Sequence, residues 1–131
     1  LTGTGDELFP LRVRVGDAEF ALDLELAPEK PLVLQGQAGW SRKGEEPGNS
    51  SYYYSATRMA TRGSLRVGER EFAVTGSSWL DREWSTSVLD EGQVGWDWFA
   101  VQLDDGRELM LYRLRQRDGS ASPWSSGTLV A

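Results

Sequence analysis

The sequence predicts an all-β protein made of antiparallel strands joined by tight turns. Glycine is plentiful, at 15 of 131 residues, whereas proline is sparse, at 5. Apolar and polar residues alternate with a period of two in several segments, and turn-forming sequences separate these segments. No segment of helical length shows a convincing apolar period of about 3.6 residues. A meander of this kind curls into a barrel or a sandwich, and a barrel of about eight strands can hold one small ligand.

The first predicted hairpin has Gly16-Asp17 as its two-residue turn. Apolar residues alternate with charged residues on both sides of this turn. In the resulting register Val13 faces Phe20, and the apolar side chains all share one face of the ribbon. A register that separates apolar from charged side chains in this way favours the pairing.

The middle of the chain predicts a loop, a strand and a second hairpin. Residues 39–50 are polar and predict a loop long enough to border a site. Tyr52-Tyr53-Tyr54 predicts a strand with aromatic side chains on both faces. A second hairpin is expected around Gly68, a second polar loop at residues 120–127, and the start of another strand from residue 127.

Asp105-Gly106 is a strong signal for a third hairpin with a two-residue turn. In that register Phe99 faces Tyr112, and Asp97 shares the more apolar face with both. If this face lines the interior, Asp97 is a carboxylate inside an apolar cavity; a buried water or a tyrosine partner is the alternative explanation. The opposite face then carries two arginine-on-tryptophan stacks, Trp98 with Arg113 and Trp96 with Arg115.

The stretch from residue 79 to residue 99 is the candidate site, because it combines aromatic surface with acids. It holds four of the six tryptophans, and Asp81, Glu83 and Asp97 stand among them. A carboxylate removed from water by indole rings is costly unless it is paired or protonated. The stretch therefore suits either an apolar ligand or acid chemistry on one. In the alternative interpretation the tryptophans are core and the acids face solvent or pair with Arg82.

Composition excludes several classes of function. The net charge is −6 and no basic stripe stands out, which argues against nucleic-acid binding. The chain has no cysteine and no histidine, so Ser-His-Asp and Cys-His catalysis, disulfides and the usual zinc sites are impossible within it. No apolar run approaches the roughly 20 residues of a membrane span. We therefore predict no metal and no cofactor, and proton transfer is left to Asp, Glu, Tyr and Lys.

Four motifs occur in a defined order along the chain: Tyr52-Tyr53-Tyr54-Ser55, Trp79-Leu80-Asp81-Arg82-Glu83-Trp84-Ser85, Gly95-Trp96-Asp97-Trp98-Phe99 and Asp104-Asp105-Gly106-Arg107-Glu108-Leu109-Met110-Leu111-Tyr112-Arg113. Together they resemble the AttH-like, lipocalin-like proteins, a family that includes the carotenoid 1,2-hydratases (hydroxyneurosporene synthases); related folds serve fungal Diels–Alderases. The resemblance implies a calycin-type antiparallel barrel or half of one. Residues 1–131 would form a single lipocalin-like domain, the first half of a longer two-barrel protein. A periplasmic or secreted location is favoured on the same ground.

Three functions follow from these observations. The first is binding of an apolar small molecule (a lipid, an isoprenoid or a polyene) in a cavity lined by tryptophan and tyrosine. Another is a structural role, in which the site lies at the junction with a second lipocalin-like half as partner. The predicted ligand-binding residues are Tyr53, Trp79, Trp84, Trp96, Trp98 and Tyr112.

The remaining function, implied by the resemblance to the hydratases, is acid-catalysed hydration or isomerisation of an alkene. Asp81 would protonate the alkene, water would capture the carbocation, and Glu83 and Asp97 would support the reaction. Arg82 stands where many relatives have His, and a guanidinium that contacts Asp81 favours the ionised form, which cannot donate a proton. Strand alternation allows Arg82 to point away, with Asp81 and Glu83 on one face together with Trp79.

Overall fold

The computed structural model describes residues 8–46, 48–85 and 89–131, and within these residues it contains strands and turns but no helix. No helix long and apolar enough to cross a membrane is present in this part of the chain. Every strand pair with a defined register is antiparallel. The predicted all-β, antiparallel class is therefore confirmed. The described strands are β1 (Leu11–Gly16), β2 (Phe20–Pro28), β3 (Val33–Leu34), β4 (Trp40–Arg42), β5 (Ser50–Val67), β6 (Arg70–Ser85), β7 (Gln93–Gln102), β8 (Glu108–Gln116) and β9 (Ser126–Val130).

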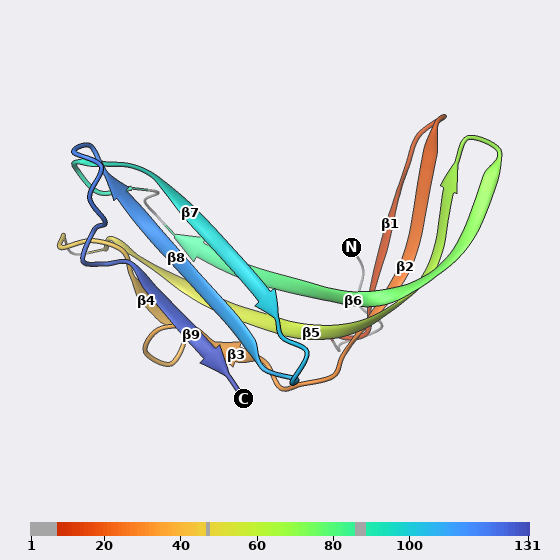
Figure 1. The fold of residues 1–131 in the computed structure, drawn as a ribbon, viewed down its shortest axis with the longest axis horizontal. Helices are drawn as coiled ribbons and strands as arrows, with labels where there is room; N and C mark the ends of the chain where they lie inside the picture. Colours follow the sequence, from red (N-terminus) through yellow and green to blue (C-terminus); the bar gives the residue numbers. More distant parts are fainter. Residues whose placement is uncertain (1–7, 47, 86–88) are drawn as a thin grey trace. The chain divides into compact units, whose positions relative to one another are not determined.

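The chain divides into two compact units, which we describe separately. The first unit comprises Leu1–Pro31 and Arg58–Trp79, and the second comprises Leu32–Thr57 and Leu80–Ala131. The two longest strands, β5 with 18 residues and β6 with 16, contribute residues to both units (Figure 1). Neither sheet closes on itself in the described ranges, so half of a barrel fits the architecture better than a complete one.

The first hairpin forms in the first unit, but its turn lies later than predicted. Val13 pairs with Leu24 rather than with Phe20. The reason is the Asp17 carboxylate, which accepts hydrogen bonds from the backbone N–H groups of Glu19 (2.7 Å) and Phe20 (3.0 Å) and so fixes the turn after itself. Because the partner of Val13 moves by an even number of residues, the apolar side chains still share one face, as expected.

The second unit contains two sheets. In one, β3 and β4 pair with the first part of β5, and β6 also pairs with β5; the other contains β7, β8 and β9 in that order (Figure 1). The tyrosine run at residues 52–54 lies in β5, as predicted. The predicted loop at residues 39–50 is wrong in part, because β4 pairs with the start of β5 within it. The second polar loop, predicted for residues 120–127, is also shorter than predicted: it ends at residue 125, because β9 begins at Ser126.

The β7–β8 hairpin forms in a register one residue away from the predicted one. Asp97 pairs with Arg113. The cause is a longer loop than the sequence suggested: the Leu103 N–H donates to the Arg107 carbonyl (2.8 Å), and Gly106 adopts the left-handed conformation at φ 86° inside it. Asp-Gly thus closes a three-residue loop instead of a two-residue turn.

A slip of one residue exchanges the two faces of a strand. Trp96 and Trp98 therefore line the cavity with Tyr112, and Asp97 lies on the opposite face. The predicted place of Asp97 inside the cavity is wrong. The predicted arginine-on-tryptophan stacks at Trp96 and Trp98 are also wrong, since the cation–π contacts of the described residues involve other pairs.

Glycine at the β5–β6 turn offers a test of the fold. Gly68 has φ 59°, whereas Gly76 is in the interior of β6, and a Cβ at either position would meet no atom within 4 Å. We expect Gly68→Ala to lower the free energy of unfolding by about 1 kcal/mol, because the left-handed conformation is unfavourable for residues with a Cβ. Gly76→Ala should leave it unchanged or raise it by about 0.5 kcal/mol. Urea unfolding measures both, and an equal loss in the two variants would contradict the turn.

Candidate functional site

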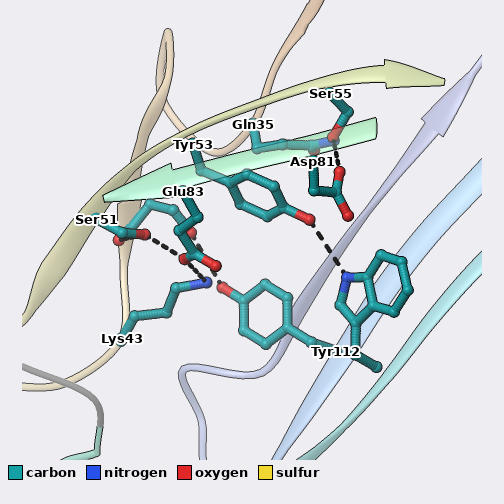
Figure 2. Close-up of polar contacts among 10 residues, drawn as sticks. Gln35, Lys43, Ser51, Tyr53, Ser55, Asp81, Glu83 and Tyr112 are labelled. Atoms are coloured by element: carbon teal, nitrogen blue, oxygen red, sulfur yellow. Dashed lines mark hydrogen bonds and ion pairs between the residues drawn. The ribbon is translucent and has the colours of Figure 1, made fainter. Parts of the chain in front are cut away.

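A cavity of about 240 Å³ lies between the two sheets of the second unit. The sheets are joined at its wall by two side-chain hydrogen bonds. The Trp98 indole N–H donates to the Tyr53 hydroxyl (3.3 Å), and the hydroxyls of Ser41 and Tyr112 are 3.3 Å apart (Figure 2). The cavity is lined by Lys43, Tyr53, Glu83, Ser85, Trp96, Trp98, Tyr112 and Leu114.

One polar cluster at the cavity is built around the Lys43–Glu83 ion pair. The Lys43 Nζ lies 3.1 Å from Glu83 Oε1, which also accepts a hydrogen bond from the Ser51 hydroxyl (2.5 Å). The ammonium lies 3.8 Å from the centroid of the Tyr112 ring and 5.4 Å from that of Tyr53 (Figure 2). Burial of an ammonium is costly without a partner, so the carboxylate and the ring faces explain why Lys43 can lie here.

A second polar cluster surrounds Asp81. The Gln35 Nε2 donates to the Ser55 hydroxyl (2.9 Å), which in turn donates to Asp81 Oδ1 (2.5 Å) (Figure 2). Ser55 and Gln35 are almost fully buried. The Gln35 Oε1 is also buried and has no hydrogen-bond partner among the described residues. The Gln35 amide oxygen is therefore an unused hydrogen-bond acceptor, connected to the Asp81 carboxylate through Ser55.

Tyr53 connects the two clusters. Its ring faces Lys43, and its hydroxyl lies close to Asp81 (Figure 2). Burial raises the pKa of Tyr53 above its ordinary value, and the neighbouring Asp81 carboxylate raises it further, while the Trp98 N–H opposes this. The hydroxyl is consequently neutral, and able to donate, throughout the physiological pH range.

Most of the predicted aromatic residues come together at this cavity. Tyr53, Trp96, Trp98 and Tyr112 all line it, and so does Glu83. Asp81 contacts Ser55 on the same face of β6 that carries Glu83, as the strand alternation predicted.

Three predicted site residues lie elsewhere. Trp79 belongs to the first unit. Trp84 is on the other face of β6, where it is 53% exposed and its ring lies 5.7 Å from that of Tyr54. Asp97 faces away from the cavity, with its Oδ1 3.6 Å from the Arg115 Nε. Neither Trp84 nor Asp97 is placed to meet a ligand in the cavity.

The sequence interpretation missed Lys43, Ser51, Ser55 and Gln35. The two serines could have been found, because a period of two from Tyr53 places them on the same face of β5. Lys43 and Gln35 lie in short connections without periodicity, so no local pattern marked them. A search of the described residues finds no group of three or more Asp or Glu arranged to hold a metal ion.

The strands and the lined cavity define a lipocalin-like β-protein. The AttH-like family model matches residues 1–131, and the chain belongs to the AttH-like family. No curated protein matches the chain. The crystal structure of an AttH from Nitrosomonas europaea is 42% identical, with a TM-score of 0.84 over 90% of this chain and 37% of that one. Kievitone hydratase from Nectria haematococca is 17% identical, with a TM-score of 0.66 over 90% of this chain and 39% of that one, a likeness of fold alone. The chain thus spans well under half the length of both proteins.

The raised pKa of Tyr53 predicts how stability depends on alkaline pH. The folded state keeps the proton on Tyr53 above pH 10, where an unfolded tyrosine loses it. The contribution of protonated Tyr53 to the free energy of unfolding is therefore fully present below about pH 10. It is lost as the pH rises through the folded pKa, by up to about 1.4 kcal/mol per pH unit. We expect the free energy of unfolding of Tyr53→Phe to fall less steeply in this range. Parallel curves for the two proteins would show that Tyr53 titrates normally.

Proposed function

We propose that the second unit binds a small, mainly apolar molecule in its aromatic cavity. The observation that carries this proposal is the exposure of Trp96 and Trp98, at 51% and 43%, on the face that lines the cavity. Apolar surface in contact with water is unfavourable by about 25 cal/mol per Å², so a ligand that covers the two indoles gains this free energy. Tyr53 and Tyr112 add further aromatic wall.

The size and lining of the cavity restrict the ligand. A volume of about 240 Å³ is below the roughly 300–1,000 Å³ of common small-molecule pockets. A short isoprenoid fits this volume, as does one end of a longer lipid or polyene. Convergent polar groups in a mainly aromatic wall are the arrangement that fixes a ligand's orientation.

Two tryptophans of similar exposure on opposite faces provide a matched test of binding. Trp96 is 51% exposed and lines the cavity, whereas Trp84 is 53% exposed on the other side of its sheet. We expect Trp96→Ala to weaken binding of the fluorescent probe N-phenyl-1-naphthylamine at least about 5-fold, because the indole's contact area is lost. Trp84→Ala should leave the affinity unchanged. Fluorescence titration measures both, and equal effects would place binding outside the cavity.

The Asp81 cluster supports a second candidate, acid-catalysed hydration of an alkene. An ionised Asp81 accepts the Ser55 hydrogen bond as found. A protonated Asp81 can donate to the Ser55 oxygen, and a rotation of the Gln35 amide by about 180° then brings its oxygen, which has no described partner, into the place of the nitrogen that faces the Ser55 hydroxyl. The cluster thus suits both protonation states, as a proton donor requires.

In this reaction the Asp81 O–H bond breaks as a C–H bond forms on the alkene, and a carbocation results. Water then adds to the cation, and the proton that it loses restores the acid, so no co-reactant other than water is needed. Aromatic faces such as that of Trp98 stabilise a passing cation. The fold shared with a hydratase agrees with this candidate, although a fold alone does not fix a function.

Hydration of terpenoid alkenes in ¹⁸O-labelled water, followed by mass spectrometry, tests the second candidate. We expect Asp81→Asn to abolish labelled alcohol formation, and Ser55→Ala to reduce it about 3- to 10-fold through loss of one hydrogen bond. Glu91→Gln, an exposed acid of the same unit, is the control and should retain the activity. Product formation that survives Asp81→Asn would exclude Asp81 as the proton donor.

A further inference from the structure

Lys43 brings more hydrogen-bond donors to the cavity than its described contacts use. An ammonium carries three N–H groups, and Glu83 Oε1 at 3.1 Å takes one of them. The rings of Tyr53 and Tyr112 attract the charge but are not conventional acceptors. The Lys43 side chain is only 12% exposed, so little bulk water reaches it. Donors therefore remain that a ligand in the cavity can use.

Glu83 has the complementary capacity, because both of its described polar contacts involve the same oxygen. Lys43 and Ser51 each contact Oε1, and in the described part of the chain Oε2 has no hydrogen-bond partner. The Glu83 side chain is 39% exposed and lines the cavity. A donor and an acceptor of opposite charge thus stand next to each other on one wall.

This pair distinguishes ligands by the charge of their polar end. A hydroxyl group both donates and accepts, so it can accept from Lys43 and donate to Glu83 Oε2 at once. A carboxylate attracted to Lys43 would meet the like charge of Glu83, and an ammonium attracted to Glu83 would meet Lys43. We propose that the cavity selects neutral apolar molecules that end in a hydroxyl group, recognised jointly by Lys43 and Glu83. This inference rests on the proposed binding of an apolar molecule and names its chemical class.

Ten-carbon isoprenoids that differ only at one end provide the test. Geraniol carries a hydroxyl, geranic acid a carboxylate and geranylamine an ammonium, while myrcene is a hydrocarbon of similar size. Each competes with N-phenyl-1-naphthylamine for the full chain at pH 7. We expect geraniol to bind about 3- to 10-fold more tightly than the other three, the effect of one to two net hydrogen bonds. Measurement at high salt removes the long-range effect of the net charge of −6 and should preserve the order.

Two variants should each weaken the preference for the hydroxyl, one in favour of the carboxylate and the other in favour of the ammonium. Glu83→Gln leaves Lys43 without its counter-charge, so geranic acid should gain about 3- to 10-fold relative to geraniol. Lys43→Met keeps the apolar stem and leaves Glu83 alone, so geranylamine should gain by a similar factor. Glu91→Gln changes the net charge as Glu83→Gln does, but at an exposed position outside the cavity, and should change no ratio.

The outcomes separate this inference from the binding function on which it rests. If the probe does not bind the wild-type chain, the binding function fails and the inference with it. If the probe binds but geranic acid or geranylamine equals geraniol, hydroxyl selection is overturned and apolar binding stands. The same conclusion holds if Glu83→Gln shifts the ratios no more than Glu91→Gln. Circular dichroism and probe affinity show that each variant is folded, and either variant alone suffices for the test.

Discussion

Strict two-residue alternation along β5 and β6 is the constraint on which the site depends. It turns Ser51, Tyr53 and Ser55 to one side of β5, and the two serines donate hydrogen bonds there to Glu83 and Asp81 of β6. Tyr54 and Trp84 then pack against each other on the outer face. A slip of one residue in either strand would exchange these faces, replacing the polar clusters by aromatic rings. The cavity therefore exists only in one register.

The opposite wall depends on a single backbone conformation. Gly106 at φ 86° closes the β7–β8 loop with an odd number of residues, and this choice turns Trp96 and Trp98 inward. Their indoles then complete the aromatic lining of the cavity, in which the Tyr112 ring lies against the Lys43 ammonium. The buried charge in turn requires Glu83, since the rings alone offer the ammonium no anionic partner. Backbone geometry at a loop thus determines which side chains of β7 line the cavity.

Local sequence signals predicted the all-β class and the existence of the hairpins, and they failed on turn position and register, where a single residue decides between geometries. Asp-Gly closes loops of two or three residues equally well, so the register at Gly106 could not be read from its dipeptide. The Asp17 side chain moved the first turn by bonding two backbone N–H groups, a local effect that alternation does not encode. Lys43 was missed for a different reason. Its contacts are with Glu83 and Tyr112, which follow it by 40 and 69 positions in the chain, and no local pattern around Lys43 indicates such distant contacts.

The two proposed activities use two neighbouring polar clusters, and the position of Tyr53 links them. Its ring faces the Lys43 ammonium, while its hydroxyl accepts the Trp98 N–H beside Asp81. On our proposal, a ligand held by its hydroxyl at Lys43 and Glu83 lies with its apolar body along this ring. Anchoring at one end restricts which carbon atoms can approach the Asp81 side, and such positioning is a major source of catalytic rate. Selective binding would then be a precondition of the acid chemistry rather than an alternative to it, because an unanchored alkene has no fixed orientation towards the carboxyl group.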